Sequence, residues 1–226
     1  MGCLLKQGGG LHPRLRIGAV LLAAGEGLRL RGVVKSLIRL QGVPLINRQL
    51  VALSGAGVDE VVVVTGHARE AIEQQVRSFV VTLAHNESHA SGQQSSVRVG
   101  LKALSGQFDA VFVMLADQPL IGAGDLVELI GAFKKRAGGH IVVPMVEGRR
   151  GNPVVLDDVA IAKILASDTN LGCPPLIEQE PELVSAHRTD NKRFTTDLDT
   201  FEDVQQLTDS TGWRFELPPQ ESVSVT

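Results

Sequence analysis

A glycine-rich segment near the N-terminus could bind a phosphate group. Residues 21–35 read LLAAGEGLRLRGVVK and directly follow an apolar run. The glycines would let backbone N–H groups approach an anion closely, and Arg29 and Lys35 could neutralise its charge. Two familiar phosphate-binding patterns fail, because Leu30 replaces the Gly or Ala of the dinucleotide fingerprint and Val34 replaces the Gly before a Walker A lysine. From composition alone, a glycine-rich turn with two solvated bases is an equal alternative.

Two acidic segments lie further along the chain. Asp117 comes just after the apolar run Ala110–Leu115, where the end of a strand could present it to Mg²⁺ and nucleotide phosphates. Asp before Gln-Pro is also a common turn former, which is the alternative interpretation of this residue. Asp197 and Asp199 are separated by one residue, so in an extended segment both carboxylates would face the same side. A purely structural role would place Asp199 beside a helix cap and leave Asp197 solvated.

Two further segments carry polar residues or glycines that suit a binding site. Residues 86–101 read NESHASGQQSSVRVGL, and Ser95 or Ser96 could cap the helix that this segment enters. Residues 148–154 read GRRGNPV, in which the two arginines could pair with an anionic substrate. An ordinary two-glycine hairpin turn explains the second segment almost as well. The six histidines show no metal-binding spacing, and we assign none of them a role.

Alternating strands and helices must position these residues. Five apolar runs are predicted as strands buried on both faces, namely Ile17–Ala23, Glu60–Val64, Val80–Ala84, Ala110–Leu115 and His140–Pro144. Four stretches with apolar residues at three-to-four spacing are predicted as helices, namely Leu45–Ser54, His67–Phe79, Ser95–Leu104 and Gly124–Arg136. This alternation predicts an α/β fold with a mostly parallel central sheet covered by helices. Ligands of such sheets bind beyond the carboxyl ends of the strands.

The C-terminal half of the chain is less regular. Four further elements are expected there: a strand within Gly151–Leu156, a helix over Asp158–Leu165, a short helix opened by Pro174 and Pro175, and a helix capped by Thr200. We therefore divide the chain into a loose lead-in (residues 1–16), a single domain (17–211) and a poorly ordered tail (212–226).

Length and composition disfavour several classes of protein. A chain of 226 residues with 43% hydrophobic and 21% charged residues suits one globular domain. The net charge of -3 disfavours a dedicated nucleic-acid binder, and no apolar run is long enough to predict a transmembrane helix. The two cysteines lie far apart and the start of the chain lacks a signal-peptide pattern, so we expect a reduced, cytoplasmic protein without membrane attachment.

The glycine-rich segment and the ten residues after it resemble a known signature. The two glycines, Arg29, a further glycine and Lys35 precede the stretch SLIRLQGVPL at residues 36–45. This pattern is similar to that of the sugar-phosphate and cofactor nucleotidyltransferases, and among these to the molybdenum cofactor cytidylyltransferases. The resemblance runs from about Ile17 to Val204 and implies a Rossmann-like three-layer α/β/α nucleotidyltransferase fold. Arg31 departs from it, because many members have glycine there, and Lys35 comes one place later than in the shortest loop.

The resemblance implies a role for individual residues. Arg29, Lys35 and Asp117 would be the catalytic residues. Asp117 and Asp199 would bind Mg²⁺, with Asp197 as the alternative to Asp199. The acceptor substrate would contact Gly148, Gly151 and Asn152. Nucleotide binding would involve a larger set, namely Leu22, Ala23, Ala24, Gly25, Gly27, Arg29, Lys35, Gly92, Ser95, Ser96 and Asp117.

The same resemblance implies a reaction. Residues 92–101 match the cytidylyltransferase type, and the Gly-Pro-Leu-Ala-Gly turn of the guanylyltransferase branch is absent, which favours CTP over GTP. The expected activity is Mg²⁺-dependent transfer of CMP to a phosphate-bearing acceptor such as molybdopterin, in association with a molybdenum hydroxylase. The alternatives are guanylyl or other nucleotidyl transfer to a different acceptor, and a maturation protein that carries a cofactor to its enzyme.

Overall fold

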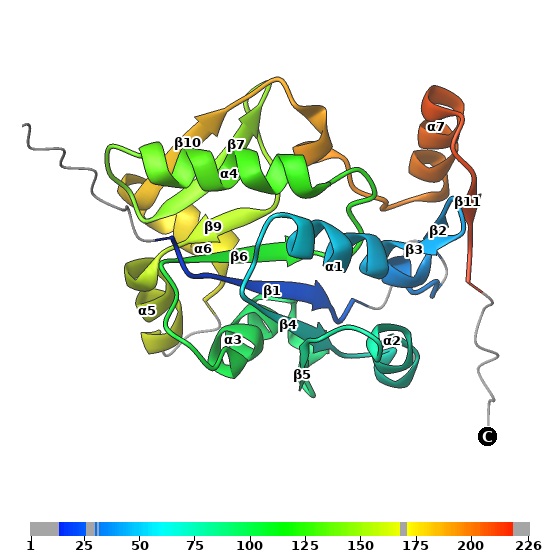
Figure 1. Cartoon of the computed structure of the whole chain (residues 1–226), viewed down its shortest axis with the longest axis horizontal. Helices are drawn as coiled ribbons and strands as arrows, with labels where there is room; N and C mark the ends of the chain where they lie inside the picture. The colour runs from blue at the N-terminus through cyan, green and yellow to red at the C-terminus, as the bar shows by residue number, and fades with distance from the viewer. Residues whose placement is uncertain (1–13, 26–29, 31, 168–170, 219–226) are drawn as a thin grey trace, which may run out of the picture.

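The computed structural model describes residues 14–25, 30, 32–167 and 171–218. Within them, an eight-stranded sheet has the order β10-β7-β9-β6-β1-β4-β5, with β8 paired to β7 (Figure 1). Its strands are β1 (Ile17–Ala23), β4 (Glu60–Thr65), β5 (Thr82–His85), β6 (Ala110–Leu115), β7 (Ile141–Val146), β8 (Arg149–Arg150), β9 (Val154–Leu156) and β10 (Val184–Arg188). The central strand β1 runs parallel to both β4 and β6, and β9 is antiparallel between β6 and β7.

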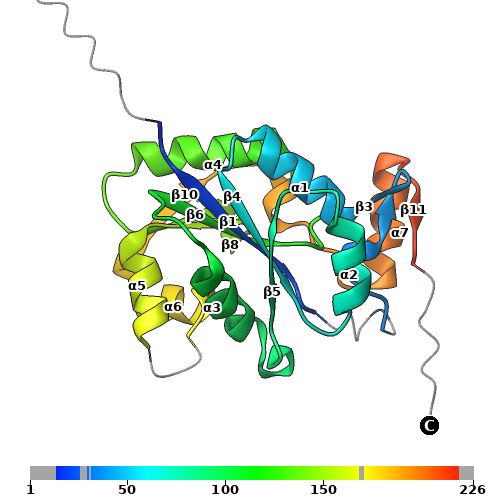
Figure 2. The same ribbon diagram turned by 60° about the horizontal axis from the view of Figure 1, so that its bottom comes forward.

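Helices cover both faces of this sheet (Figure 2). They are α1 (Leu45–Gly55), α2 (Arg69–Val76), α3 (Gln93–Ala103), α4 (Ala123–Lys135), α5 (Asp158–Ala166) and α6 (Cys173–Gln179). Because successive strand residues point to opposite faces, Ala19 and Leu21 of β1 pack with α1, α2 and α4, whereas Val20 and Leu22 pack with α3, α5 and α6. The result is a three-layer α/β/α arrangement with two apolar cores, which confirms the predicted fold class.

A smaller sheet packs beside the main one, with order β11-β2-β3. It consists of β2 (Arg39–Leu40), β3 (Val43–Pro44) and β11 (Phe215–Glu216), and α7 (Phe201–Thr211) lies beside it (Figure 1). A third apolar cluster, which includes Leu40 and Leu198, joins these elements. Thr200 caps α7 as predicted, because its side chain accepts a hydrogen bond from the backbone N–H of Asp203.

The structure corrects the expected ends of the domain. The prediction of a loose tail from Gly212 is wrong at Phe215–Glu216, because this strand pairs with β2 and Phe215 packs against the third cluster. The last residues of the lead-in are hydrogen-bonded to the domain. The Arg14 side chain donates to Asp59 at 2.9 Å, and the backbone N–H of Arg16 donates to the Asp109 carboxylate. Residues 1–13 and 219–226 lie outside the described part of the chain.

Some element boundaries also differ from the sequence prediction. The strands β1 and β6 begin and end where predicted. The edge strand β5 begins two residues later than expected, at Thr82, because Val80 is fully exposed and does not join the sheet. Short 3-10 helices occur at Lys35–Leu37, His89–Ser91, Pro181–Leu183 and Lys192–Thr195. Among the described residues, no helix combines the length and apolar character needed to cross a membrane.

Candidate active site

A cavity of about 600 Å³ opens at the carboxyl ends of β1 and β6. This is where the topology of an open parallel sheet places ligands. Its lining comes from the ends of the two strands, from the 3-10 helix after the glycine-rich segment, from the start of α3 and from the segment before α7. The lining residues are Leu22, Ala23, Ala24, Gly25, Lys35, Ser36, His89, Ala90, Gly92, Gln93, Ser96, Leu115, Ala116, Asp117, Asp197 and Asp199.

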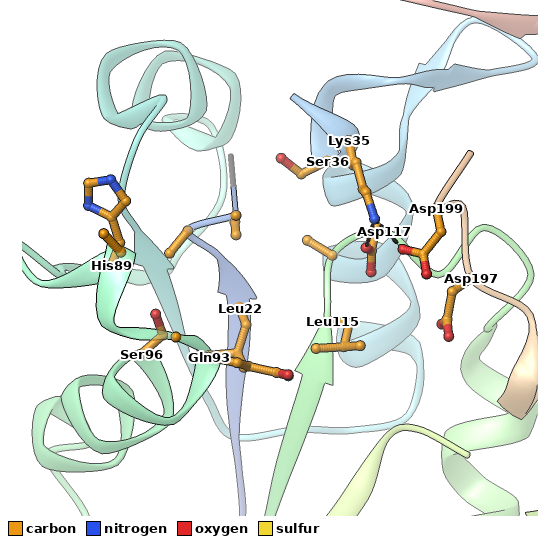
Figure 3. A pocket seen from close by; sticks show the side chains of 16 residues that line it. Leu22, Lys35, Ser36, His89, Gln93, Ser96, Leu115, Asp117, Asp197 and Asp199 are labelled. Carbon is orange, nitrogen blue, oxygen red and sulfur yellow. Dashed lines mark hydrogen bonds and ion pairs between the residues drawn. The ribbon is translucent and has the colours of Figure 1, made fainter. Parts of the chain in front are cut away.

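One side of the cavity, which we call the charged wall, consists of Lys35, Asp117, Asp197 and Asp199 (Figure 3). The Lys35 ammonium lies 2.5 Å from a carboxylate oxygen of Asp199 and 3.3 Å from one of Asp117. Burial alone would lower the pKa of Lys35, but its bonds to the two carboxylates outweigh burial and raise the pKa above its usual 10.5. Lys35 is therefore a permanent cation held at the end of β6.

The two buried carboxyls of this wall hold their protons more tightly than usual. Burial raises the pKa of Asp117 above its usual 3.8, although the Lys35 ammonium opposes this shift. Burial, together with the weaker repulsion from Asp117 and Asp199, raises the pKa of Asp197 to about 6. One carboxylate oxygen of Asp197 is buried without a hydrogen-bond partner in the structure. The alternative that left Asp197 solvated is therefore wrong, and a cation near this wall would stabilise all three carboxylates.

The opposite side, which we call the α3 wall, consists of His89, Gly92, Gln93 and Ser96 (Figure 3). The predicted cap at Ser95 or Ser96 is wrong, because α3 begins at Gln93 and Gly92 precedes it with φ of 98°, a conformation that glycine adopts most readily. Ser96 lines the cavity, whereas the Ser95 hydroxyl donates to the Gly92 carbonyl and is not among the lining residues.

Asn86 holds the α3 wall together from beneath. This side chain is almost fully buried, and its amide donates to the hydroxyls of Ser95 at 2.8 Å and Ser96 at 2.9 Å. Its carbonyl oxygen accepts the backbone N–H of Ser88 at 3.0 Å. Sequence reasoning missed Asn86, and it also missed His89 and Gln93 as lining residues. Their position beside the predicted Gly92 and Ser96 was the available signal.

Gln118 connects the charged wall to the predicted acceptor turn. It is fully buried, and its amide donates to the backbone carbonyls of Asn152 at 3.3 Å and Phe194 at 3.4 Å. A hydrogen bond from Gln118 also reaches Asp197, where it opposes the rise in pKa. The Gln118 backbone carbonyl accepts from the side chain of Gln49 on α1. One residue next to Asp117 thus joins segments that lie far apart in the sequence.

The predicted acceptor residues do not line the main cavity. Gly148 lies in the hairpin between β7 and β8, with φ of 81°, and it lines neither the main cavity nor a smaller second one. Gly151 and Asn152 instead line this second cavity, of about 160 Å³. At Gly151 any side chain would collide with the Phe194 backbone, since an added Cβ would stand 2.6 Å from its carbonyl oxygen. Gly27 and Arg29, also predicted for the site, lie outside the described residues.

The donors of the charged wall suit a divalent cation. In the described part of the chain, no three His, Cys, Asp or Glu side chains form a preassembled metal-binding group. Mg²⁺ at nucleotide sites, however, uses one or two carboxylates together with phosphate oxygens and water. Asp117 and Asp199 already share one cationic group, and Asp197 presents a buried oxygen without a partner beside them. These donors fit a divalent cation bound together with a phosphate.

Fold and site together define a three-layer α/β protein with a charged cavity at the carboxyl ends of its central parallel strands. The family model of the MobA-like NTP transferase domain matches residues 19–184. The chain therefore belongs to the MobA-like NTP transferase family, in agreement with the sequence resemblance.

Curated relatives match the chain over different lengths. Nicotine blue oxidoreductase of Paenarthrobacter nicotinovorans is 29% identical over 196 residues, which cover 83% of this chain and 94% of that protein. The bifunctional protein GlmU of Pelobacter propionicus is 33% identical over 138 residues, which cover 61% of this chain. The match spans only 29% of GlmU, so the chain corresponds to less than a third of that relative's length.

Solved structures share the fold at low sequence identity. A nucleotidyl transferase from Methanothermobacter thermautotroptrophicus superposes with a TM-score of 0.72 at 22% identity, covering 86% of this chain and 97% of that one. Rv0371c of Mycobacterium tuberculosis, in complex with manganese, gives a TM-score of 0.67 at 21% identity, with 87% and 100% covered. The CTP:phosphocholine cytidylyltransferase LicC of Streptococcus pneumoniae gives 0.63 at 17% identity, with 87% and 99% covered.

Proposed function

We propose that this enzyme transfers CMP from CTP to a phosphate-bearing acceptor of the molybdopterin type, with Mg²⁺ held by Asp117 and Asp199. The observation that carries the proposal is the Lys35 ammonium, which two carboxylates hold at the end of β6, across the cavity from the α3 wall. The cavity volume of about 600 Å³ falls in the range of small-molecule sites. A molybdenum hydroxylase that receives the product is the proposed partner.

The reaction needs positioning and charge neutralisation more than covalent chemistry. A phosphate oxygen of the acceptor attacks the α-phosphorus of CTP and forms a new P–O bond. The bond from the α-phosphorus to the oxygen that bridges to the β-phosphorus breaks, and pyrophosphate leaves with the electron pair. The acceptor phosphate is largely ionised near neutral pH, because its second pKa is about 6, so no general base is required.

Each side chain of the charged wall would have its own electrostatic role in this reaction. Bound Mg²⁺ would supply polarisation of the α-phosphate. Asp117 and Asp199 would hold the metal ion, and Lys35, which lies between these two carboxylates, would neutralise charge on the leaving pyrophosphate. Arg29, on the glycine-rich segment, is proposed to neutralise the same leaving group. Asp197 would add a carboxylate behind Asp199 and increase the negative potential that attracts the metal ion.

The preference for CTP rests on residues 92–101. Gly92 and Ser96 line the side of the cavity away from the carboxylates, where the base and ribose of a nucleotide would lie if its phosphates faced Lys35. Gly151 and Asn152 are proposed to face the acceptor.

A thermal shift experiment with CTP, GTP, ATP and UTP, each with and without Mg²⁺, tests nucleotide binding. At about 100 times the dissociation constant, a ligand adds about 2.7 kcal/mol of stability. For a chain of this size this corresponds to a rise in melting temperature of roughly 5–10 °C. We expect a Mg²⁺-dependent shift with CTP, and then pyrophosphate release when molybdopterin is added.

Other outcomes would change the assignment. A larger shift with GTP would move the protein to the guanylyltransferase branch, and release with a different organic phosphate would replace the acceptor. CTP binding without pyrophosphate release from any acceptor would favour a maturation protein that carries a cofactor. No shift with any nucleotide, alone or with acceptor, would contradict the proposal, and redox activity would then be tested because one relative is named an oxidoreductase.

A further inference from the structure

The second cavity, of about 160 Å³, lies beside the main cavity along the same face of the sheet. Alternate residues of a strand share a face, so Val113, which lines the second cavity, lies on the same side of β6 as Leu115, which lines the main one. Gln93 lines both cavities. A molecule that extends from the charged wall into the second cavity would therefore pass the Gln93 side chain.

Gln93 and Gln94 are adjacent residues of one type with different surroundings. Gln93 is the first residue of α3, and its side chain extends beneath Leu22 toward Leu115 (Figure 3). Gln94 packs against Gly172, since a Cβ added at this glycine would stand 2.8 Å from the Cγ of Gln94, and Gln94 is not among the residues that line either cavity. Only the first of the two amides is therefore placed to contact a ligand.

The second cavity offers neutral hydrogen-bonding groups beside its valines. The side-chain amides of Gln93 and Asn152 each carry donors and an acceptor. The Arg150 guanidinium is already paired with the carboxylate of Glu178 at 2.6 Å. Burial raises the pKa of the Cys173 thiol to about 12, so this group is uncharged near neutral pH. Such a lining suits an uncharged group that has both donors and acceptors and a partly apolar surface.

The two amides are available to a ligand. Within the described residues, no hydrogen bond engages the side-chain amide of Gln93 or of Asn152. The backbone of Asn152 is fixed, because its carbonyl accepts from the buried Gln118 and its N–H donates to the Phe194 carbonyl at 2.8 Å. A ligand that bonds to the Asn152 side chain would therefore require little rearrangement of the backbone.

We propose that Gln93 determines acceptor specificity by hydrogen-bonding, together with Asn152, a polar ring next to the acceptor's phosphate. The inference rests on the proposed function, which places this phosphate at the charged wall. A ring with donors and acceptors regains at the two amides the hydrogen bonds that it loses to water. An apolar ring of the same size leaves the amides without partners, which is the basis on which polar sites reject such analogues. A pterin carries the required donors and acceptors.

Binding without catalysis tests this inference. Protein with labelled side-chain amides is titrated, in the absence of nucleotide, with neopterin phosphate, which has a polar ring, or with phenyl phosphate, which has an apolar one. We expect neopterin phosphate to bind at least about 10-fold more tightly, since two ordinary hydrogen bonds are worth roughly this factor. The NMR resonances of the Gln93 and Asn152 amides should shift with neopterin phosphate.

The variant Gln93→Met should remove much of this preference, because methionine has a similar length and makes no comparable hydrogen bonds. Its affinity for neopterin phosphate should fall at least about 5-fold, with unchanged affinity for phenyl phosphate and for CTP with Mg²⁺. Gln94→Met is the matched control and should bind all three ligands as the unmodified protein does. Glutamine and methionine have similar helix propensities, so α3 should persist in both variants, as checked by thermal unfolding.

Four results would overturn the inference. They are equal affinity of the unmodified protein for the two probes, an unchanged preference in Gln93→Met, an equal loss of the preference in Gln94→Met, and a loss of CTP affinity in Gln93→Met as large as the loss for neopterin phosphate. The last result would assign Gln93 to the nucleotide instead. Failure of the proposed nucleotidyl transfer would appear differently, as missing pyrophosphate release while the preference that depends on Gln93 persists.

Discussion

The two walls of the active-site cavity are built in different ways. The charged wall joins Lys35 to Asp117, 82 residues away, and to Asp199, 164 residues away. The α3 wall is local, because the Asn86 amide bonds to Ser95 and Ser96, which are nine and ten residues away. The charged wall consists of side chains brought together from three segments, and the α3 wall consists of residues from one segment, 89–96.

The two walls therefore have different roles: the charged wall carries the chemistry, and the α3 wall supports the shape of the site. In the charged wall the groups affect one another's pKa. Asp117 and Asp199 raise the pKa of Lys35, and the Lys35 ammonium opposes the rise that burial causes in the pKa values of Asp117 and Asp197. In the α3 wall, neutral hydrogen bonds fix the shape of a turn and of the helix start. Substitutions in the charged wall should therefore alter turnover and pH dependence, whereas substitutions in the α3 wall should mainly alter stability and nucleotide affinity.

The largest effect is expected from removal of a charge at the reaction centre. Lys35→Met or Asp117→Ala should lower turnover at least about 100-fold, the usual loss when one preorganised electrostatic contact is removed. Steady-state pyrophosphate release measures this effect. Lys102→Met, on an exposed position of α3, is the control and should keep its turnover. Near-normal turnover in both Lys35→Met and Asp117→Ala would contradict the assigned roles.

The charged wall should also make stability depend on pH. Asp197 has a pKa of about 6 in the folded protein, against an ordinary value of 3.8. As the pH rises, the unfolded chain therefore loses this proton at a lower pH than the folded protein does. The free energy of unfolding then falls as the pH rises from about 4 to 6, by up to about 3 kcal/mol. Asp197→Asn should remove the part of this decline that Asp197 causes and leave the part due to Asp117, whose pKa burial also raises, as measured by urea unfolding of metal-free protein at several pH values.

The pH dependence of the Asp197→Asn variant is compared with that of a control variant. Asp190→Asn replaces an exposed carboxylate and should leave the pH profile unchanged. An identical decline in the Asp197→Asn variant would show that another group is responsible.

In the α3 wall, Asn86→Ala should lower the free energy of unfolding by about 1–2 kcal/mol. The change leaves the backbone N–H of Ser88 and the two serine hydroxyls without their buried partner. Weaker nucleotide binding should accompany the loss, while turnover at saturating nucleotide should fall far less than in the Lys35 variant. Calorimetry and denaturant unfolding measure both effects, with the exposed Gln107→Ala as control. A large fall in turnover at saturating nucleotide would contradict the proposed difference between the two walls.

The smallest effect is expected at Glu128, which supports the segment leading to the charged wall. Burial would raise its pKa, but hydrogen bonds from His187, Thr189 and Asn191 outweigh burial and hold the pKa below 4.5. A lowered carboxyl pKa stabilises the fold above the unfolded value of 4.5, and this contribution is lost as the pH falls through the folded value.

Glu128→Gln should therefore reduce stability by less than about 1 kcal/mol at neutral pH, because Glu128 is partly exposed. The difference from the unmodified protein should vanish below the folded pKa. Urea unfolding from about pH 3 to pH 7 measures this, and an equal loss at every pH would contradict it.

The sequence predicted the layers and the location of the site. Uninterrupted apolar runs such as Ile17–Ala23 favour strands buried on both faces, and the helical stretches between them favour a mostly parallel sheet. The helix cap at Thr200 was equally local and is confirmed by its bond to Asp203. The start of α3 was less well predicted, because Gly92, with φ of 98°, precedes the helix where the prediction placed a serine cap.

Other features depended on distant packing. β11 pairs with β2 although about 175 residues separate them, and nothing in the local composition after Gly212 predicts this pairing. The sequence assigned Gln118 no role, yet its amide donates to the backbone carbonyls of Asn152 and Phe194, which lie 34 and 76 residues further along the chain.

The sequence by itself determined the residue types at the reaction centre and their place after the ends of strands. It set Lys35 on the glycine-rich segment, Asp117 after β6 and a pair of carboxylates before α7. Only the tertiary structure decided that Lys35 bridges Asp117 and Asp199 while Asp197 keeps a buried, unpartnered oxygen. The physical reason is that pKa values and ion pairs depend on distance and burial in space, which spacing along the chain does not specify.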